Sequence, residues 1–246
     1  MVKKIKYSII ITTYNYEKYI GYCIDSCLNQ SQNIDYEVIV VNDGSTDNTE
    51  DVLKSYKNEF LSYYTIPNSG IEGASNFGFK RAKGSYIVRV DADDLLNKDF
   101  LKIMDSHIDD SSLKFYYSNY FVINNAGKVL EEVSLPPFSK EEILNRGDFL
   151  ATGTVYRKDY LEKIGFYSEK IKNTGLENYE LMLSLLTMGI KGKRIPDPLF
   201  CYRRHDLNMS EIKRKKIINY GKELFKKFDA GIFRTNENHP YKLKLD

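Results

Sequence analysis

The sequence predicts an α/β fold with a mostly parallel central sheet, and three observations lead to that prediction. Short β-branched runs without charge recur, they alternate with stretches of helical periodicity, and polar residues follow the ends of the runs. A strand that is buried on both faces has such a continuous apolar run. Strands that alternate with helices at this spacing imply right-handed βαβ crossovers.

The first half of the chain supplies four of the expected strands. We place them at 7–12, 36–41, 62–66 and 85–90, with helices at about 17–30, 46–60 and 74–83 between them. Cys23 and Cys27 share one face of the first helix, as expected for small buried thiols. An Asn-Asp-Gly-Ser turn follows the second strand, after which Ser45 or Thr46 can cap the next helix. Gly84 suits the C′ position of the third helix.

The pattern changes after residue 95. A helix is expected at about 98–108, then a hairpin of strands at 115–123 and 129–133, helices at 140–146, 158–164 and 178–188, and a last strand at 194–202. From residue 211 the chain reads EIKRKKIINYGKELFKKF, which is typical of a basic amphipathic helix. No linker separates the halves, so we expect one domain and not two.

The composition excludes several classes of protein. Lys and Arg number 36 against 34 Asp and Glu, so the net charge of +2 gives no basic field for nucleic acid. Three cysteines without a secretory leader argue against a disulfide framework. The apolar run at 9–11 is too short for a signal peptide or a membrane span, so we expect a cytoplasmic protein. The basic helix at 211–228 could pack through its apolar stripe, which we favour, or contact the inner face of the membrane.

Carboxylates gather where the predicted strands end. Asp91, Asp93 and Asp94 directly follow the fourth strand, at the edge where ligands bind in open α/β sheets. Two oxygen donors at i and i+2 suit Mg²⁺ or Mn²⁺, with a diphosphate supplying other ligands. Asp94 alone could instead cap the next helix. Asp43 ends the second strand in the same way and could accept a hydrogen bond from a planar base or a ribose hydroxyl.

Three segments in the first half carry a resemblance to a known family: SIIITTYNYEKYI, YEVIVVNDGSTDNT and NSGIEGASNFGFKRAKGSYIVRVDADD. In this order and spacing they resemble the family 2 glycosyltransferases, which have the GT-A fold. GTVYRKDYLEKIGFY, GLENYELMLSLLTMG and YRRHDLNMS continue the resemblance to about residue 210. It implies a GT-A domain at 1–210, with a nucleotide-binding half at about 1–95 and an acceptor-binding half at about 96–210. A basic helix and tail would follow at 211–246.

The resemblance also implies an activity. It is metal-dependent, inverting transfer of a sugar from a nucleotide-diphospho sugar to an acceptor hydroxyl, in the synthesis of a bacterial surface polysaccharide or related glycan. The donor would be a UDP-sugar by first choice, and the acceptor a glycan or a lipid-linked sugar. A carboxylate would take the proton of the attacking hydroxyl as general base.

Site residues follow from the same motifs. The resemblance assigns the nucleotide-sugar pocket to residues at three strand ends: Thr12, Tyr14, Asn15, Asp43, Asp91, Ala92 and Asp93. It assigns the Mn²⁺ or Mg²⁺ ion to Asp93, Asp91 and His205. It assigns the sugar or acceptor side to Gly153 and Thr154, with Arg203 able to neutralise phosphate charge.

The expected base is where this sequence departs from the family. The family places it in the Asp of a Glu-Asp pair that opens a helix, and here the pair is Glu177-Asn178. An amide cannot accept a proton at neutral pH. Glu177 is our first choice as base and Glu180 the second, although both could simply be acids favoured by the helix dipole. A catalytically silent member that binds sugar nucleotide as an assembly partner is the alternative function.

A second departure concerns phosphate binding. Ser75 stands where the family often has Arg, so Lys80 or Arg81 would have to supply that contact. A sugar-nucleotide pyrophosphorylase has a related sheet, but it needs a glycine-rich loop after the first strand to hold a triphosphate. That loop reads TTYNYEKY here, without glycine, which disfavours this third function.

Overall fold

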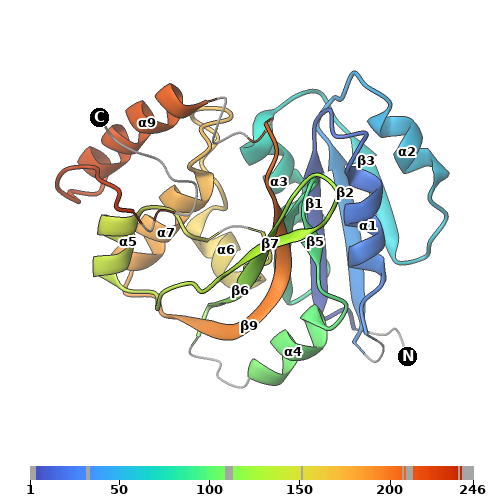
Figure 1. Ribbon diagram of the computed structural model, residues 1–246, viewed down its shortest axis with the longest axis horizontal. Helices are drawn as coiled ribbons and strands as arrows, with labels where there is room; N and C mark the ends of the chain where they lie inside the picture. Colours follow the sequence, from blue (N-terminus) through green and yellow to red (C-terminus); the bar gives the residue numbers. More distant parts are fainter. Residues whose placement is uncertain are drawn as a thin grey trace.

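The computed structural model describes residues 4–31, 34–108, 113–150, 152–206, 208, 213–237 and 239 of the 246-residue chain. Its strands form one sheet in the order β3-β2-β1-β4-β8-β6-β9-β5, with β7 paired to β6. Figure 1 shows α1 and α2 on one side of β1 and α3 on the other. The chain is therefore an α/β domain built on one continuous sheet.

The first half of the sheet is parallel, as predicted. β1 (Tyr7–Thr13), β2 (Tyr36–Asn42), β3 (Leu61–Thr65) and β4 (Tyr86–Asp91) pair in parallel, and α1 (Ile20–Leu28), α2 (Thr49–Ser55) and α3 (Gly70–Arg81) connect them. Every residue of β1 and β2 is buried, which explains their uninterrupted apolar runs. β1 lies between β2 and β4 with Thr12 in register with Asp91, so the carboxyl ends of the strands meet at one edge.

The second half mixes strand directions. It contains β5 (Leu95–Leu96), α4 (Phe100–His107), β6 (Phe115–Ile123), β7 (Val129–Val133), α5 (Lys140–Arg146), β8 (Val155–Arg157), α6 (Lys158–Ile164), α7 (Glu177–Thr187) and β9 (Gly192–Arg203). β8 pairs antiparallel with β4 and β6, β7 with β6, and β5 with β9, while β6 and β9 run parallel. The mostly parallel arrangement thus describes the first half of the sheet, and the second half curls across it in Figure 1.

Three expected caps are wrong. α2 begins at Thr49 and not at Ser45 or Thr46, because the Ser45 hydroxyl instead accepts the N–H of Asn15 at 2.9 Å. α3 ends before Ala82, and Gly84 packs so closely on β1 that a Cβ there would lie 2.6 Å from the backbone. Asp94 does not cap α4, since its Oδ1 accepts the backbone N–H of Arg203 at 2.8 Å.

The basic helix α9 (Arg214–Lys227) packs against the domain, as we favoured. Its stripe of Ile217, Tyr220, Leu224 and Phe225 is buried, and the Phe225 ring lies 6.2 Å from that of Tyr179 in α7. The apolar stripe is therefore not available to enter a membrane. Residues 211 and 212 of the predicted helix lie outside the described residues. Within the described ranges, no helix has the length and apolar content needed to cross a bilayer.

The thiols are placed as the sequence predicted. Cys23 and Cys27 are fully buried in α1, Cys201 is partly buried in β9, and all three are free. They contribute to packing and not to a covalent framework.

Candidate active site

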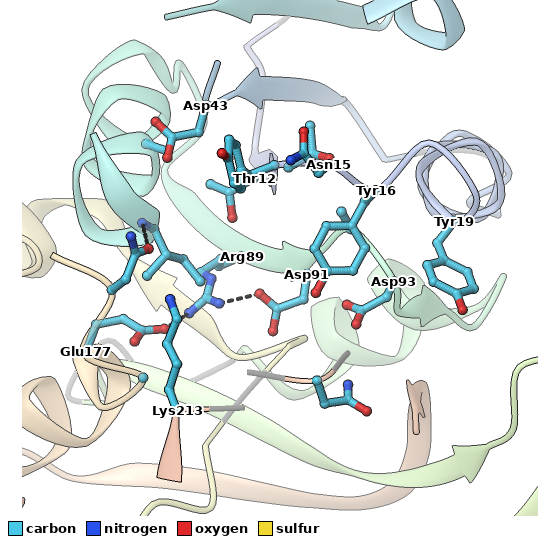
Figure 2. A pocket seen from close by; sticks show the side chains of 18 of the residues that line it. Thr12, Asn15, Tyr16, Tyr19, Asp43, Arg89, Asp91, Asp93, Glu177 and Lys213 are labelled. Carbon is cyan, nitrogen blue, oxygen red and sulfur yellow. Dashed lines mark hydrogen bonds and ion pairs between the residues drawn. The ribbon is translucent and has the colours of Figure 1, made fainter. Parts of the chain in front are cut away.

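A cavity of about 650 Å³ opens where the carboxyl ends of β1, β2 and β4 meet the segment before α7 and the start of α9. Figure 2 shows side chains from both halves of the chain pointing into it, with Asp43 and Thr12 on one side and Lys213 on the other. All seven residues predicted for the nucleotide-sugar pocket line this cavity: Thr12, Tyr14, Asn15, Asp43, Asp91, Ala92 and Asp93.

The loop after β1 is fixed by its backbone conformation. Asn15 has a left-handed φ of 60°, which Asn tolerates better than most residues. Its side-chain oxygen accepts the N–H of Thr46 at 2.7 Å, and this bond joins the loop after β1 to the loop after β2. The two loops thus form one polar rim, on which the Tyr14 ring is 46% exposed.

Asp43 holds the start of α3 as well as lining the cavity. Its carboxylate accepts the N–H of Ser69 at 2.6 Å, the Ser69 hydroxyl at 2.9 Å and the N–H of Gly70 at 3.0 Å. Burial raises the pKa of Asp43, and these hydrogen bonds oppose the rise. A carboxylate has about four acceptor positions. Oδ2 of Asp43 therefore retains one lone pair for a ligand.

Asp93 lines the cavity, and His205 lies buried beside it without lining the cavity itself. Their Oδ2 and Nε2 atoms lie 2.8 Å apart. The His205 ring stacks on Tyr19 with 5.0 Å between centroids, and it meets the edge of Tyr16 at 6.2 Å. Burial raises the pKa of Asp93, and His205 opposes the rise. The two aromatic rings fix the orientation of the imidazole against the carboxylate.

Of the three predicted metal ligands, Asp93 and His205 thus lie next to each other. Adjacent ligands of an octahedral ion with bonds of about 2.1 Å lie roughly 3 Å apart, which matches the separation of Asp93 and His205. Asp91 is turned instead toward Arg89, and it accepts the Thr152 hydroxyl at 3.2 Å. In the part of the chain that the structure describes, no group of three His, Cys, Asp or Glu side chains stands at metal-ligand spacing. The pair fits a divalent cation whose remaining ligands come from a diphosphate or from Asp91.

Arg89 joins the two walls of the cavity, which are the strand ends of the first half and the residues that the second half contributes. It is 4% exposed in β4, and it faces the same side of the strand as Asp91 two residues later. Its guanidinium contacts Asp91, and its Nη1 donates to Oε1 of Glu177 at 2.9 Å. The Tyr167 ring lies 5.9 Å from it. Burying a guanidinium costs a large desolvation energy, which these two carboxylates offset.

The predicted base residues separate in the structure. Glu177 and Asn178 line the cavity, whereas Glu180 does not. Glu180 accepts the Tyr220 hydroxyl at 2.8 Å and pairs with Lys227 at 2.5 Å, so it ties α7 to α9. The second choice of base is therefore wrong. Burial raises the pKa of Glu177, the charge of Arg89 opposes the rise, and Oε2 of Glu177 has no hydrogen-bond partner among the described residues.

Asn178 has a defined role of its own. Its Oδ1 accepts the Tyr167 hydroxyl at 2.6 Å, and the residue is 8% exposed on the cavity wall. The amide therefore holds the ring that lies beside Arg89.

The residues assigned to the sugar or acceptor side lie behind the cavity and do not line it. Gly153 has a φ of 78°, and a Cβ there would lie 3.0 Å from the Phe200 ring, so this glycine is needed for packing. Thr154 is buried next to it. Arg203 donates to the carbonyls of Asp93, Asn124 and Asn125 at 2.8 to 3.1 Å. Because these bonds hold Nε and Nη1 and the residue does not line the cavity, the structure does not support the predicted role of Arg203 toward phosphate.

The phosphate contact proposed for Lys80 or Arg81 is absent as well. The Arg81 guanidinium lies over the Phe77 ring at 3.5 Å, and neither residue lines the cavity. Among the described residues, the lysines and arginines that do line it are Lys18, Arg89 and Lys213. In Figure 2, Lys213 points toward Glu177 and Arg89. Burial and the charge of Lys216 lower the pKa of Lys213.

Sequence reasoning missed Arg89, Asp148, Lys213, Tyr16 and Tyr19, which all line the cavity. Arg89 carried a signal, because a single cation inside the buried run SYIVRV needs a buried anion as partner. Asp148 follows a helix in a loop with no such signal. Lys213 reads as one more lysine of a basic helix.

Comparison with known proteins identifies the family. The model of glycosyl transferase family 2 matches residues 8–165. The chain belongs to this family. It is also 32% identical over 97% of its length to chondroitin synthase from Pasteurella multocida (strain Pm70), although it spans only 26% of that protein.

Solved structures confirm the GT-A fold. Staphylococcus aureus TarS 1-349, in complex with UDP-GlcNAc, superposes with a TM-score of 0.73 at 22% identity, over 89% of this chain and 65% of that one. The mannosyltransferase PcManGT from Pyrobaculum calidifontis, in complex with GDP-Man and Mn²⁺, gives 0.70 at 18% identity, over 92% of this chain and 64% of that one. At these identities the likeness establishes the fold.

Proposed function

We propose that this chain transfers a sugar from a nucleotide-diphospho sugar to an acceptor hydroxyl, with inversion at the anomeric carbon. The observation that carries the proposal is the convergence of Asp43, Asp91 and Asp93 with the rim after β1 around one cavity, in a chain of a glycosyltransferase family. Such an edge is where open α/β sheets bind nucleotides. A UDP-sugar is the first choice of donor, since the TarS neighbour holds UDP-GlcNAc.

We propose Mn²⁺ or Mg²⁺ as cofactor, held by Asp93 and His205 together with Asp91 or the diphosphate. When bound, the ion offsets charge that builds on the departing diphosphate. Arg89 from β4 and Lys213 from the residue before α9 add positive charge to the cavity, and the burial of Arg89 strengthens its effect on a bound anion. Tyr16 and Tyr19 hold His205 in place and exclude water from its ring.

We extend the proposal to the acceptor and the cellular site. A surface polysaccharide or lipid-linked glycan as acceptor is supported by the similarity to a chondroitin synthase. Three free cysteines suit the reducing cytoplasm. Any membrane contact of α9 would be electrostatic, through its exposed Lys215, Lys216 and Lys222, because its apolar stripe is already packed.

A panel of UDP-, GDP- and dTDP-sugars with and without Mn²⁺, read by thermal shift and nucleotide release, tests the proposal. A donor at 100 times its Kd should add about 2.7 kcal/mol to the free energy of unfolding. We expect one nucleotide class to stabilise the chain in a metal-dependent way and to be released as nucleoside diphosphate. No shift and no release with any donor would contradict the proposal.

Asn178 favours a second function, that of a silent sugar-nucleotide-binding partner. It lies in the cavity with its amide bonded to Tyr167, where the family resemblance expects a carboxylate. A silent protein would show the thermal shift without release of nucleotide, and Asn178→Asp would restore release.

A further inference from the structure

Asp148 is a buried carboxylate on the cavity wall, and the proposed function assigns no role to it. It follows α5 after Gly147, whose φ is 98°, and it is 4% exposed. Its Oδ1 accepts the N–H of Leu150 at 3.2 Å. Among the described residues no cationic side chain forms an ion pair with it. One oxygen of a buried carboxylate thus remains available to a ligand in the cavity.

The other carboxylates of the cavity are committed to protein partners. They are Glu17, Asp43, Asp47, Asp91, Asp93 and Glu177. Three of them contact a basic side chain, either Arg89 or His205. Two accept backbone N–H groups on both oxygens. Glu17 accepts from both nitrogens of Asn48. A general base needs an available lone pair. Oε2 of Glu177 also has no hydrogen-bond partner among the described residues, but Oε1 of the same carboxylate is paired with Arg89. Asp148 accepts one backbone N–H and forms no ion pair with a described residue, which favours it as the base.

The surroundings of Asp148 also suit a base. Burial and the neighbouring charges of Glu177 and Asp91 raise its pKa, while Arg89 opposes the rise. A higher proton affinity makes a carboxylate a stronger base, provided that a nearby cation keeps it ionised. Arg89 is the nearby cation that opposes the rise, and it forms no ion pair with Asp148.

We propose that Asp148 accepts the proton of the attacking acceptor hydroxyl, in place of the carboxylate that the wall lacks at Asn178. This rests on the proposed glycosyl transfer. The acceptor oxygen forms a bond to the anomeric carbon while the bond from that carbon to the diphosphate oxygen breaks. The electron pair of the broken bond leaves with the nucleoside diphosphate. The hydroxyl proton moves to the Asp148 oxygen that Leu150 does not bond, and it passes to solvent after the products leave.

Asp148→Asn is the first test, because it keeps the size of the side chain and the bond from Leu150. UDP release from UDP-GlcNAc with Mn²⁺, or from the donor that the panel selects, gives kcat and the donor KM. We expect kcat to fall by about 10²-fold or more. The donor KM should stay within about threefold of the wild-type value, since only a transition-state interaction is lost. The nucleotide thermal shift should equal that of the wild type within error. Glu180→Gln, an acid of α7 outside the cavity, is the matched control and should keep its kcat.

A rescue variant separates a base from a structural residue. Asp148→Asn combined with Asn178→Asp returns one carboxylate to the same wall, so we expect kcat to recover by about tenfold or more over Asp148→Asn alone. An Asp148→Asn enzyme with wild-type kcat would overturn the proposal. So would a rescue variant that stays as slow as the single variant.

Asn178→Asp in the otherwise unchanged chain gives a test that does not depend on how Asp148→Asn folds. Since a base is already present, the added carboxylate should not raise kcat by more than about threefold. A gain above about tenfold would mean that the base was missing, and it would overturn the role of Asp148. The proposed function fails separately, if the unchanged chain releases no nucleotide from any donor.

Discussion

The two halves of the sheet contribute to the cavity in different ways. The first half brings its residues through strand ends, since β1, β2 and β4 run parallel and finish at one edge. The second half brings Asp148, Glu177 and Lys213 through a loop, a helix start and the residue before another helix. Parallel strands fix where their carboxyl ends lie, whereas loops depend on what packs beneath them. The first wall should therefore tolerate changes in distant packing better than the second.

The largest expected effect comes from the first wall. Asp93→Ala removes the carboxylate that faces His205, and we expect nucleotide release to fall by about 10³-fold, or about 4 kcal/mol of transition-state stabilisation. The variant should stay folded at the assay temperature, although its melting temperature should fall because the buried His205 loses this partner. Kinetics and a thermal melt measure both. Asp51→Ala on the exposed face of α2 is the control, and full activity of Asp93→Ala or of the wild type in EDTA would contradict the metal site.

The next effect tests whether Arg89 holds the two walls together. Arg89→Met leaves the buried Glu177 and the partly exposed Asp91 without their cation, which should cost about 3–5 kcal/mol of folding free energy. For a chain of this length that lowers the melting temperature by roughly 6–20 °C. Adding Glu177→Gln should recover part of the loss, since the uncompensated charge is removed. A melting temperature within about 2 °C of wild type would show that the walls are joined by other contacts.

A smaller effect is expected within the second half. Glu180→Gln weakens the contacts of α7 with Tyr220 and Lys227, and since Lys227 is half exposed we expect a loss of about 1 kcal/mol. Chemical denaturation measures it, and kcat should not change. A tenfold or larger drop in kcat at unchanged donor affinity would return Glu180 to the list of candidate bases.

The smallest effect is a pH dependence of stability at Asp148. Because the folded pKa of this carboxyl is raised by burial and by Glu177, its contribution is fully present below the unfolded pKa of about 3.9 and is lost as pH rises through the folded pKa. Asp148→Asn removes this loss. The melting temperature of the variant relative to wild type should therefore rise as the pH increases above about 4, and it should level off once the pH exceeds the folded pKa. A constant difference over that range would contradict a raised pKa.

Much of the fold could be predicted from the sequence because its elements have local signals. The strands 115–123 and 129–133 and the helices 140–146 and 158–164 have the predicted bounds, and the other predicted elements differ by a few residues at their ends. The short strands β5 and β8 were not predicted. Two of the three misplaced caps share one cause. Ser45 and Asp94 each bond a distant backbone N–H in preference to the nearby helix, and no local pattern contains that competition.

The site residues show the same difference between local signals and distant contacts. Seven nucleotide-side residues reach the cavity because they sit at or beside parallel strand ends. In the second half, Gly153 and Arg203 turned out to support the wall and Glu180 to tie two helices. Their partners are Phe200, backbone carbonyls and Lys227, and those contacts exist only after the second half has packed.

The sequence by itself determined that this is a family 2 chain with a parallel nucleotide-binding half and carboxylates at its strand ends, since strand burial and turn chemistry are written in neighbouring residues. The tertiary structure alone decided which of those carboxylates stay available. Arg89 engages Asp91 and Glu177, His205 faces Asp93, and Asp148 is left with a single backbone bond. The pKa and the hydrogen bonding of a buried charged group depend on the partners that lie within a few ångströms of it. Those partners come from segments far apart in the chain.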